Sequence, residues 1–195
     1  MSLDDFLFYF QLGWSHLVSF DALDHQLFIL SLIALYTISD IKKIVILVTA
    51  FTIGHSITLF LSVIDVFRLQ SNWVEFLIPC TIIITALSNI SKIKSKNNAT
   101  TINYYFAMGF GLIHGMGFAN TIRMILAKDQ IIGWGLLSFN IGLEIGQLFF
   151  VAFILLLTTL ALEYFKVKKS NWVLFISAAV FSLSLQMALK RIPLN

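Results

Sequence analysis

Residues 44–64 read IVILVTAFTIGHSITLFLSVI, a run that contains no Asp, Glu, Lys or Arg. Charged residues flank it, with Lys42 and Lys43 before the run and Asp65 directly after it. A helix of about 20 residues crosses a hydrocarbon layer of ~30 Å, so an apolar run of this length between charged flanks predicts a transmembrane helix.

Similar runs recur along the chain and predict five further spans, over residues 23–39, 73–90, 102–126, 131–162 and 172–189. Residues 3–20 form a shorter, aromatic segment, which we interpret as an interfacial or half-inserted helix. The predicted fold class is therefore all-α, a polytopic integral membrane bundle of about six transmembrane helices over residues 23–190. Together with the N-terminal segment 1–20 it would form a single membrane domain, residues 1–195.

Composition supports this prediction and excludes a soluble domain. The 195 residues are 58% hydrophobic and 12% charged, with a mean hydropathy of +0.90, whereas soluble domains carry about 25% charged residues. Because most of the lysines behind the net charge of +3 lie in short loops, we expect the lipid bilayer as a partner and not nucleic acid. Cys80 is the only cysteine, so no disulfide can form within the chain.

Lysines mark alternate loops of the predicted bundle. These loops contain Lys42, Lys43, Lys92, Lys94, Lys96, Lys166, Lys168 and Lys169. The positive-inside rule places such loops in the cytoplasm, so both termini are expected outside, in what we take to be a bacterial inner membrane. The N-terminus lacks the basic region and cleavage site of a secretory signal, and we expect it to be retained.

Ionisable side chains within or beside the apolar runs are the candidate functional residues, because charge is costly in hydrocarbon and normally marks a site inside the bundle. They are His16, Asp21, Asp24, His25, His55, His114 and Glu144. Glu144 is the hardest to explain structurally, since a carboxylate in mid-span needs a partner. The spans 73–90 and 172–189 carry no charge in their interior and are expected to be scaffold.

Uncharged polar side chains recur at helical spacing beside these residues. The spacing places Thr52 and Thr58 on one helix face with His55, and Asn140 and Gln147 on one face with Glu144. They are candidates to hydrogen-bond the histidines and fix their tautomers. Alternatively, the threonines bond their own helix backbone, and Asp21 and Asp24 cap the N-terminus of a helix.

Histidine combined with carboxylate is the ligand set of a divalent transition metal such as Ni, Co or Zn, because imidazole donates a lone pair and the carboxylate neutralises charge. Glycines around His114 and near Glu144 would allow helices to approach closely. We therefore predict one metal site between the spans, with His25, His55, His114 and Glu144 within roughly 10 Å of a common point. Asp21, Asp24 and His16 are further candidate ligands.

Four motifs, in the same order, resemble the HupE/UreJ family of small membrane proteins, which are named for hydrogenase and urease accessory functions and regarded as nickel or cobalt permeases. The motifs are residues 24–28 (DHQLF), 51–59 (FTIGHSITL), 111–119 (GLIHGMGFA) and 139–147 (FNIGLEIGQ). The resemblance covers about residues 13–150, leaves the last span unmatched, and implies metal handling. His16 matches the family pattern least well, because it stands nine residues before His25. The lack of a signal peptide is a second departure.

The residues leave three functions open. The leading one is a divalent-metal permease or metal-binding accessory protein. The second is an intramembrane hydrolase with a tightly bound Zn that activates water and with Glu144 as general base. The third is a scaffold subunit without metal, whose polar residues only join helices. Exchangeable metal would favour the first, tight stoichiometric metal the second, and no metal the third; the sequence does not indicate a protein partner or an oligomeric state.

Overall fold

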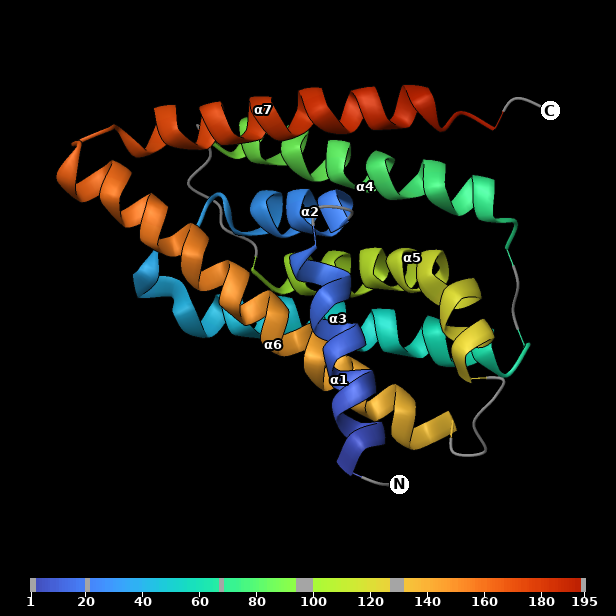
Figure 1. Ribbon diagram of the computed structural model, residues 1–195. Coiled ribbons are helices and arrows are strands. Elements are labelled where there is room, and N and C mark those ends of the chain that lie inside the picture. The colour runs from blue at the N-terminus through green and yellow to red at the C-terminus, as the bar shows by residue number, and fades with distance from the viewer. Residues whose placement is uncertain (1–2, 20–21, 67–68, 94–99, 127–131, 194–195) are drawn as a thin grey trace.

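The computed structural model describes residues 3–19, 22–66, 69–93, 100–126 and 132–193 (Figure 1). Within these residues all regular elements are helical, as the sequence predicts. In chain order they are α1 (Leu3–Val18), α2 (Leu23–Ile33), the 3-10 turn η2 (Ile38–Asp40), α3 (Ile41–Val63), α4 (Ser71–Lys92), α5 (Thr100–Leu126), α6 (Ile132–Thr159), the π-helical turn η3 (Leu160–Tyr164) and α7 (Lys169–Lys190).

Four stretches of helix in the described part of the chain are long and apolar enough to cross a membrane. They are Ile38–Val63, Ser71–Lys92, Gly133–Tyr164 and Lys169–Lys190, and each coincides with a predicted span. These helices support an integral membrane protein. The predicted total of six spans is not confirmed. The other two predicted spans correspond to α5, which is not among these four stretches, and to α2, which is short.

The helix predicted over residues 23–39 is shorter than expected, because α2 ends at Ile33. The chain then turns, and Thr37 and Asp40 form a capping box that starts η2. Eleven residues at a rise of 1.5 Å make a helix of about 16 Å, roughly half of the hydrocarbon layer. The apolar run up to Ser39 therefore contains a half-length helix and a turn rather than one span.

The helix axes are roughly parallel to one another except for those of α1 and α6, which lie obliquely across the others (Figure 1). In that view α3, α5 and α7 run one way, while α2 and α4 run the opposite way. The lysines Lys42 and Lys43 stand at the start of α3, Lys92 ends α4 and Lys169 starts α7. These helix ends lie on the same side of the bundle, so the fold gathers the lysine-rich segments at one end.

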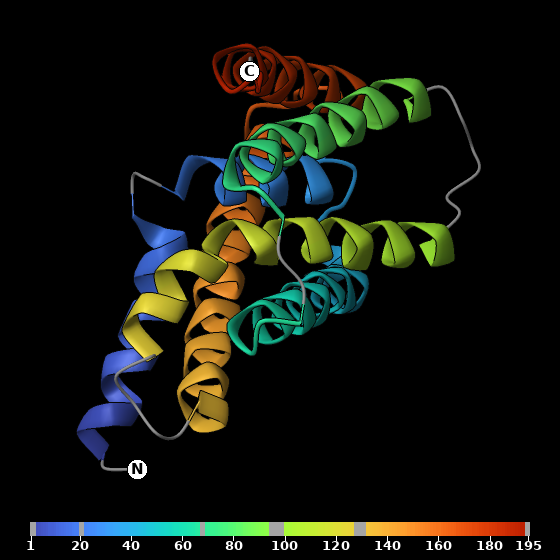
Figure 2. The same ribbon diagram turned by 90° about the vertical axis from the view of Figure 1, so that its right-hand side faces the viewer.

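Glycines bring α3 and α5 unusually close together, and these two helices pack against each other more extensively than any other pair (Figure 2). A Cβ atom added to Gly111 would collide with the carbonyl oxygen of Phe51, and one added to Gly115 would collide with that of His55. On the other side, a Cβ on Gly54 would collide with the carbonyl oxygen of Met108. Backbone contact of this kind needs small residues at spacings of four, and it fixes α3 relative to α5.

A second pair, α1 and α6, is joined in the same way. A Cβ on Gly13 would collide with the carbonyl oxygen of Phe139, and one on Gly142 with that of Phe10. The glycines of the FNIGLEIGQ motif are thus explained by packing against α1. Three of the four histidines lie on helices of these two glycine-joined pairs, and the fourth lies on α2.

Candidate metal centre

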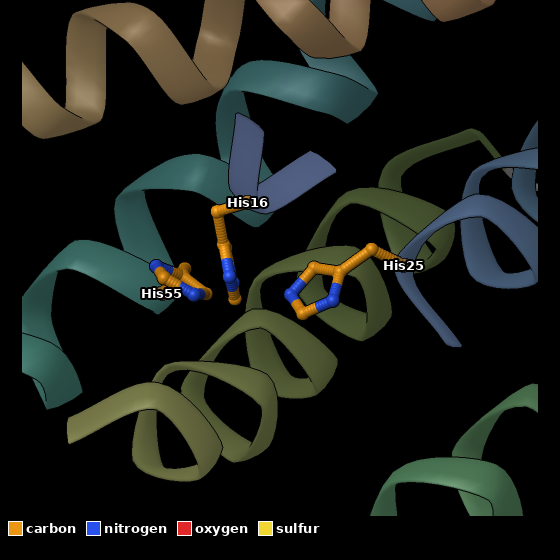
Figure 3. A group of neighbouring side chains, drawn as sticks. All are labelled: His16, His25 and His55. Carbon is orange, nitrogen blue, oxygen red and sulfur yellow. The ribbon is translucent and has the colours of Figure 1, made fainter. Parts of the chain in front are cut away.

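Three histidines from three helices form a compact group inside the bundle. His16 lies near the end of α1, His25 in the first turn of α2 and His55 in the middle of α3, and Figure 3 shows their rings turned toward one another. One nitrogen from each ring can be chosen so that all three lie within 4.8 Å of one another. Nitrogens bound to one ion at about 2.1 Å are at most about 4.2 Å apart, so a small rotation of the rings would suffice to share an ion.

His114, on α5, lies beside this group. Its ring centroid is 5.1 Å from that of His25, and its side chain is fully buried. The backbone contact of Gly115 with His55 explains the closeness, because it holds this part of α5 against α3. All four histidines of the chain therefore meet in one region, including His16, which matches the sequence pattern least well.

Asp24 orients the ring of His25. Its Oδ1 accepts a hydrogen bond from the backbone N–H of His25 at 2.9 Å and lies 3.1 Å from Nδ1 of the same ring. A carboxylate only accepts, so the proton belongs on Nδ1 and the lone pair on Nε2. A carboxylate behind the ring of a metal-binding histidine is a common arrangement, which fixes the tautomer and raises the basicity of the ligand.

Thr81, on α4, plays the same part for His114. Its hydroxyl donates to the carbonyl oxygen of Ile78 at 2.7 Å and lies 3.3 Å from Nε2 of His114. The single hydroxyl proton is used on Ile78, so Nε2 donates to Thr81 and the lone pair is on Nδ1. This contact was not expected, since residues 73–90 looked like scaffold. The sequence offers one weak signal for this contact, namely a threonine that closely follows Pro79 in an apolar helix.

Five of the other ring nitrogens are buried and unpaired. Among the described residues, no hydrogen-bond partner is present for Nε2 of His16, Nε2 of His25, both ring nitrogens of His55 and Nδ1 of His114. Leaving a buried polar atom unpaired costs about 1–3 kcal/mol. The unpaired atoms include the Nε2 of His25 and the Nδ1 of His114 that carry lone pairs, so this donor set fits a metal that prefers imidazole, such as Ni, Co or Zn.

Aromatic side chains enclose the group. The ring of Phe118 is 3.9 Å from that of His16 and stacks on Phe139 at 5.3 Å, while Phe51 lies 5.2 Å from His114. From the histidines a cavity of about 170 Å³ extends between α1, α2, α4, α5 and the end of α7. Its polar lining comprises His16, Ser19, Asp24, His25, Glu75, His114 and Arg191. The site is thus dry on one side and accessible on the other.

Glu144 has a hydrogen-bond partner outside the group of three histidines. Its Oε1 accepts a hydrogen bond from the hydroxyl of Thr49 at 2.6 Å, and in the described part of the chain the one group with metal-ligand proximity is His16, His25 and His55. The partner that a mid-span carboxylate needs is therefore a threonine on α3. The sequence reasoning missed Thr49, which stands one helical turn before Thr52.

Three of the four polar residues expected beside the histidines, Thr52, Thr58 and Gln147, bond elsewhere. Thr52 donates to Oε1 of Gln147 at 2.7 Å, and Thr58 lies within bonding distance of its own helix backbone, at Gly54 and His55. No described residue pairs with Oδ1 of Asn140 or with Nε2 of Gln147. Asp21, the remaining predicted ligand, lies outside the described residues.

Buried histidines from separate helices thus converge on one group that could hold a metal ion inside an apolar helical bundle. The chain belongs to the HupE/UreJ family, because the family model described as "HupE / UreJ protein" matches residues 1–191. The match extends beyond residues 13–150 and includes α7. No curated protein and no solved structure gave a significant match. Membership implies a role in handling nickel or cobalt.

Proposed function

We propose that the protein is a membrane permease for a divalent transition metal of the nickel or cobalt type, and that the ion passes through the group His16, His25, His55 and His114. The observation that carries this proposal is the set of buried, unpaired imidazole nitrogens turned toward one another. Histidines that merely joined helices would be hydrogen-bonded to their neighbours. A cation supplies the missing partner to several of them at once.

Passage, rather than permanent binding, is supported by a second cavity on the other side of the histidines. It measures about 100 Å³ and is lined by α2, α4 and α5 residues that include Leu32, Asn89, Lys92 and Phe110. These lie toward the opposite ends of their helices from Asp24, Glu75 and Gly117, which line the first cavity. An ion in the first cavity would therefore need to move along the helices to reach the second.

A layer of phenylalanines separates the two cavities. Phe28 stacks on Phe51 at 4.8 Å, and both rings lie close to His114, at 5.0 and 5.2 Å. Phe28 also contacts Phe110, which lines the second cavity, at 5.8 Å. Such a layer lets a permease hold its ion on one side until the helices rearrange, as alternating access requires.

The intramembrane hydrolase is less well supported. A general base must lie within hydrogen-bond reach of the metal-bound water, directly or through one water, and the carboxylate of Glu144 is instead bonded to Thr49. The scaffold alternative leaves the unpaired histidine nitrogens without an explanation.

The proposal predicts that the purified protein binds about one Ni²⁺ or Co²⁺ ion per chain and exchanges it. We would strip the protein of metal with a chelator in lipid nanodiscs, reload it, and follow release to a fluorescent metal indicator. Loss of the ion within minutes, together with Co²⁺ uptake into proteoliposomes, is the expected result. A stoichiometric Zn²⁺ that resists chelation would point to the hydrolase, and absence of binding would point to the scaffold.

We further propose that the lysine-rich end of the bundle faces the cytoplasm of a bacterial inner membrane and that both termini are outside. The gathering of the ends of α3, α4 and α7 on one side supports this orientation. In a Cys80→Ala background, a cysteine at Ser95 is expected to react only from the cytoplasmic side and one at Gln70 only from outside. An impermeant maleimide applied to intact cells and to inverted vesicles tests this, and the reverse pattern would overturn the orientation.

A further inference from the structure

Arg191 lies at the mouth of the histidine cavity, at the end of α7. Its Nη1 is 3.6 Å from Oδ2 of Asp24, and the two side chains are one-third exposed and largely buried, respectively. The residue belongs to none of the four motifs, and α7 was expected to be scaffold. It nevertheless places a guanidinium, which stays protonated at any pH the protein meets, where a divalent cation would approach.

Pro79 helps to hold Arg191 in this place. A proline inside a helix has no N–H to bond the carbonyl four residues earlier, so the carbonyl oxygen of Glu75 is left without its helical donor. Nη1 of Arg191 donates to that oxygen at 3.5 Å. The missing helical hydrogen bond in α4 thus leaves a carbonyl oxygen that accepts from the guanidinium.

Asp24 links the guanidinium to a histidine of the cluster. Its Oδ1 faces Nδ1 of His25, and its Oδ2 faces Arg191. One carboxylate therefore serves both groups, and its negative charge is shared between them. A cation that enters the cavity must compete with Arg191 for this carboxylate.

We propose that Arg191 is a tethered competitor of the transported metal, whose guanidinium occupies the mouth of the histidine cavity until a divalent cation displaces it from Asp24. This inference rests on the proposed function and adds a selectivity element to it. A monovalent cation gains too little from neutral imidazoles to displace a guanidinium. A dehydrated divalent cation gains several nitrogen ligands as well as the carboxylate.

The test compares Arg191→Gln with Lys190→Gln, which removes the same charge from the adjacent, exposed position. Ni²⁺ binding to each protein in nanodiscs would be measured by calorimetry at low and high ionic strength. Arg191→Gln is expected to tighten the Ni²⁺ Kd by roughly two- to fivefold at low salt, the scale of a partly screened ion pair, and less at high salt. Lys190→Gln is expected to leave the Kd unchanged.

Failure of this inference is distinguishable from failure of the proposed function. If the wild-type protein binds no Ni²⁺, the proposed function fails. If it binds Ni²⁺ but Arg191→Gln binds it equally or more weakly, or if both substitutions tighten binding alike, the tethered competitor is overturned. Should Arg191→Gln not yield folded protein, Arg191→Met, which keeps the aliphatic stem, carries the same comparison.

Discussion

Replacing His55 by leucine is expected to abolish binding of Ni²⁺ while leaving the protein as stable as the wild type or more stable. His55 is fully buried, and neither ring nitrogen has a partner among the described residues. Leucine removes two unpaired polar atoms, each costing about 1–3 kcal/mol, and fills a similar volume, which limits any cavity penalty. If His55 were important for the structure, its replacement would lower Tm. If His55 serves to bind metal, its replacement would leave Tm unchanged or raise it.

The loss of affinity should exceed 100-fold, since changes behind the ligands alone typically cost 10- to 100-fold. Calorimetry for Ni²⁺ and a thermal melt of the metal-free protein measure the two effects. Glu144→Gln and Cys80→Ala are the matched controls and are expected to keep the wild-type affinity, because neither side chain belongs to the histidine group. Normal Ni²⁺ binding by His55→Leu would remove the cluster as the metal site.

The second large effect concerns packing of α3 on α5. Gly115→Ala is expected to lower Tm strongly and reduce the yield of monodisperse protein, because the added Cβ would meet the carbonyl oxygen of His55 and the hydroxyl of Thr58. Inserting a methyl group into a tight contact costs about 1–3 kcal/mol, and backbone can yield less than a side chain. A size-exclusion profile with a thermal melt in detergent measures both consequences.

Gly109→Ala on the same helix is the control. A Cβ at Gly109 would meet nothing within 4 Å, so the substitution is expected to leave Tm unchanged within a degree or two or raise it slightly through better helix propensity. Equal melting temperatures for the two variants would contradict the close approach of α3 and α5.

Helix positions were largely predictable, and one length was not. The predicted run 44–64 corresponds to α3 (Ile41–Val63) and the run 73–90 to α4 (Ser71–Lys92), because apolar runs between charges record the thickness of the bilayer. Hydropathy cannot show that residues 23–39 break after Ile33, since the turn before Thr37 is apolar too. After α2 ends, the N–H of Tyr36 bonds the carbonyl oxygen of Ile33 and Thr37 bonds Asp40, and both contacts are local.

The histidines were predictable as candidates, and their grouping was only partly so. Helical spacing places Glu144 on a polar face but does not say which helix that face meets, and it meets Thr49. His16 was doubtful by spacing along the sequence, whereas its place depends on Gly13, which lets α1 lie against the backbone of α6. Thr81 contacts His114 from another helix, and Arg191 contacts Asp24 from the end of another, so only the packing of the helices reveals them.

The four histidines lie on helices that are held in place in two different ways. His55 and His114 belong to helices whose backbones touch through Gly111 and Gly115, and sliding one past the other would force carbonyl oxygens into Cα atoms. His25 stands on the half-length α2, which begins only a few residues after α1 ends. Cargo exchange would then move α2 relative to a rigid unit formed by α3 and α5. Spin-label distances between α2 and α3 should change on Ni²⁺ loading, while those between α3 and α5 should not.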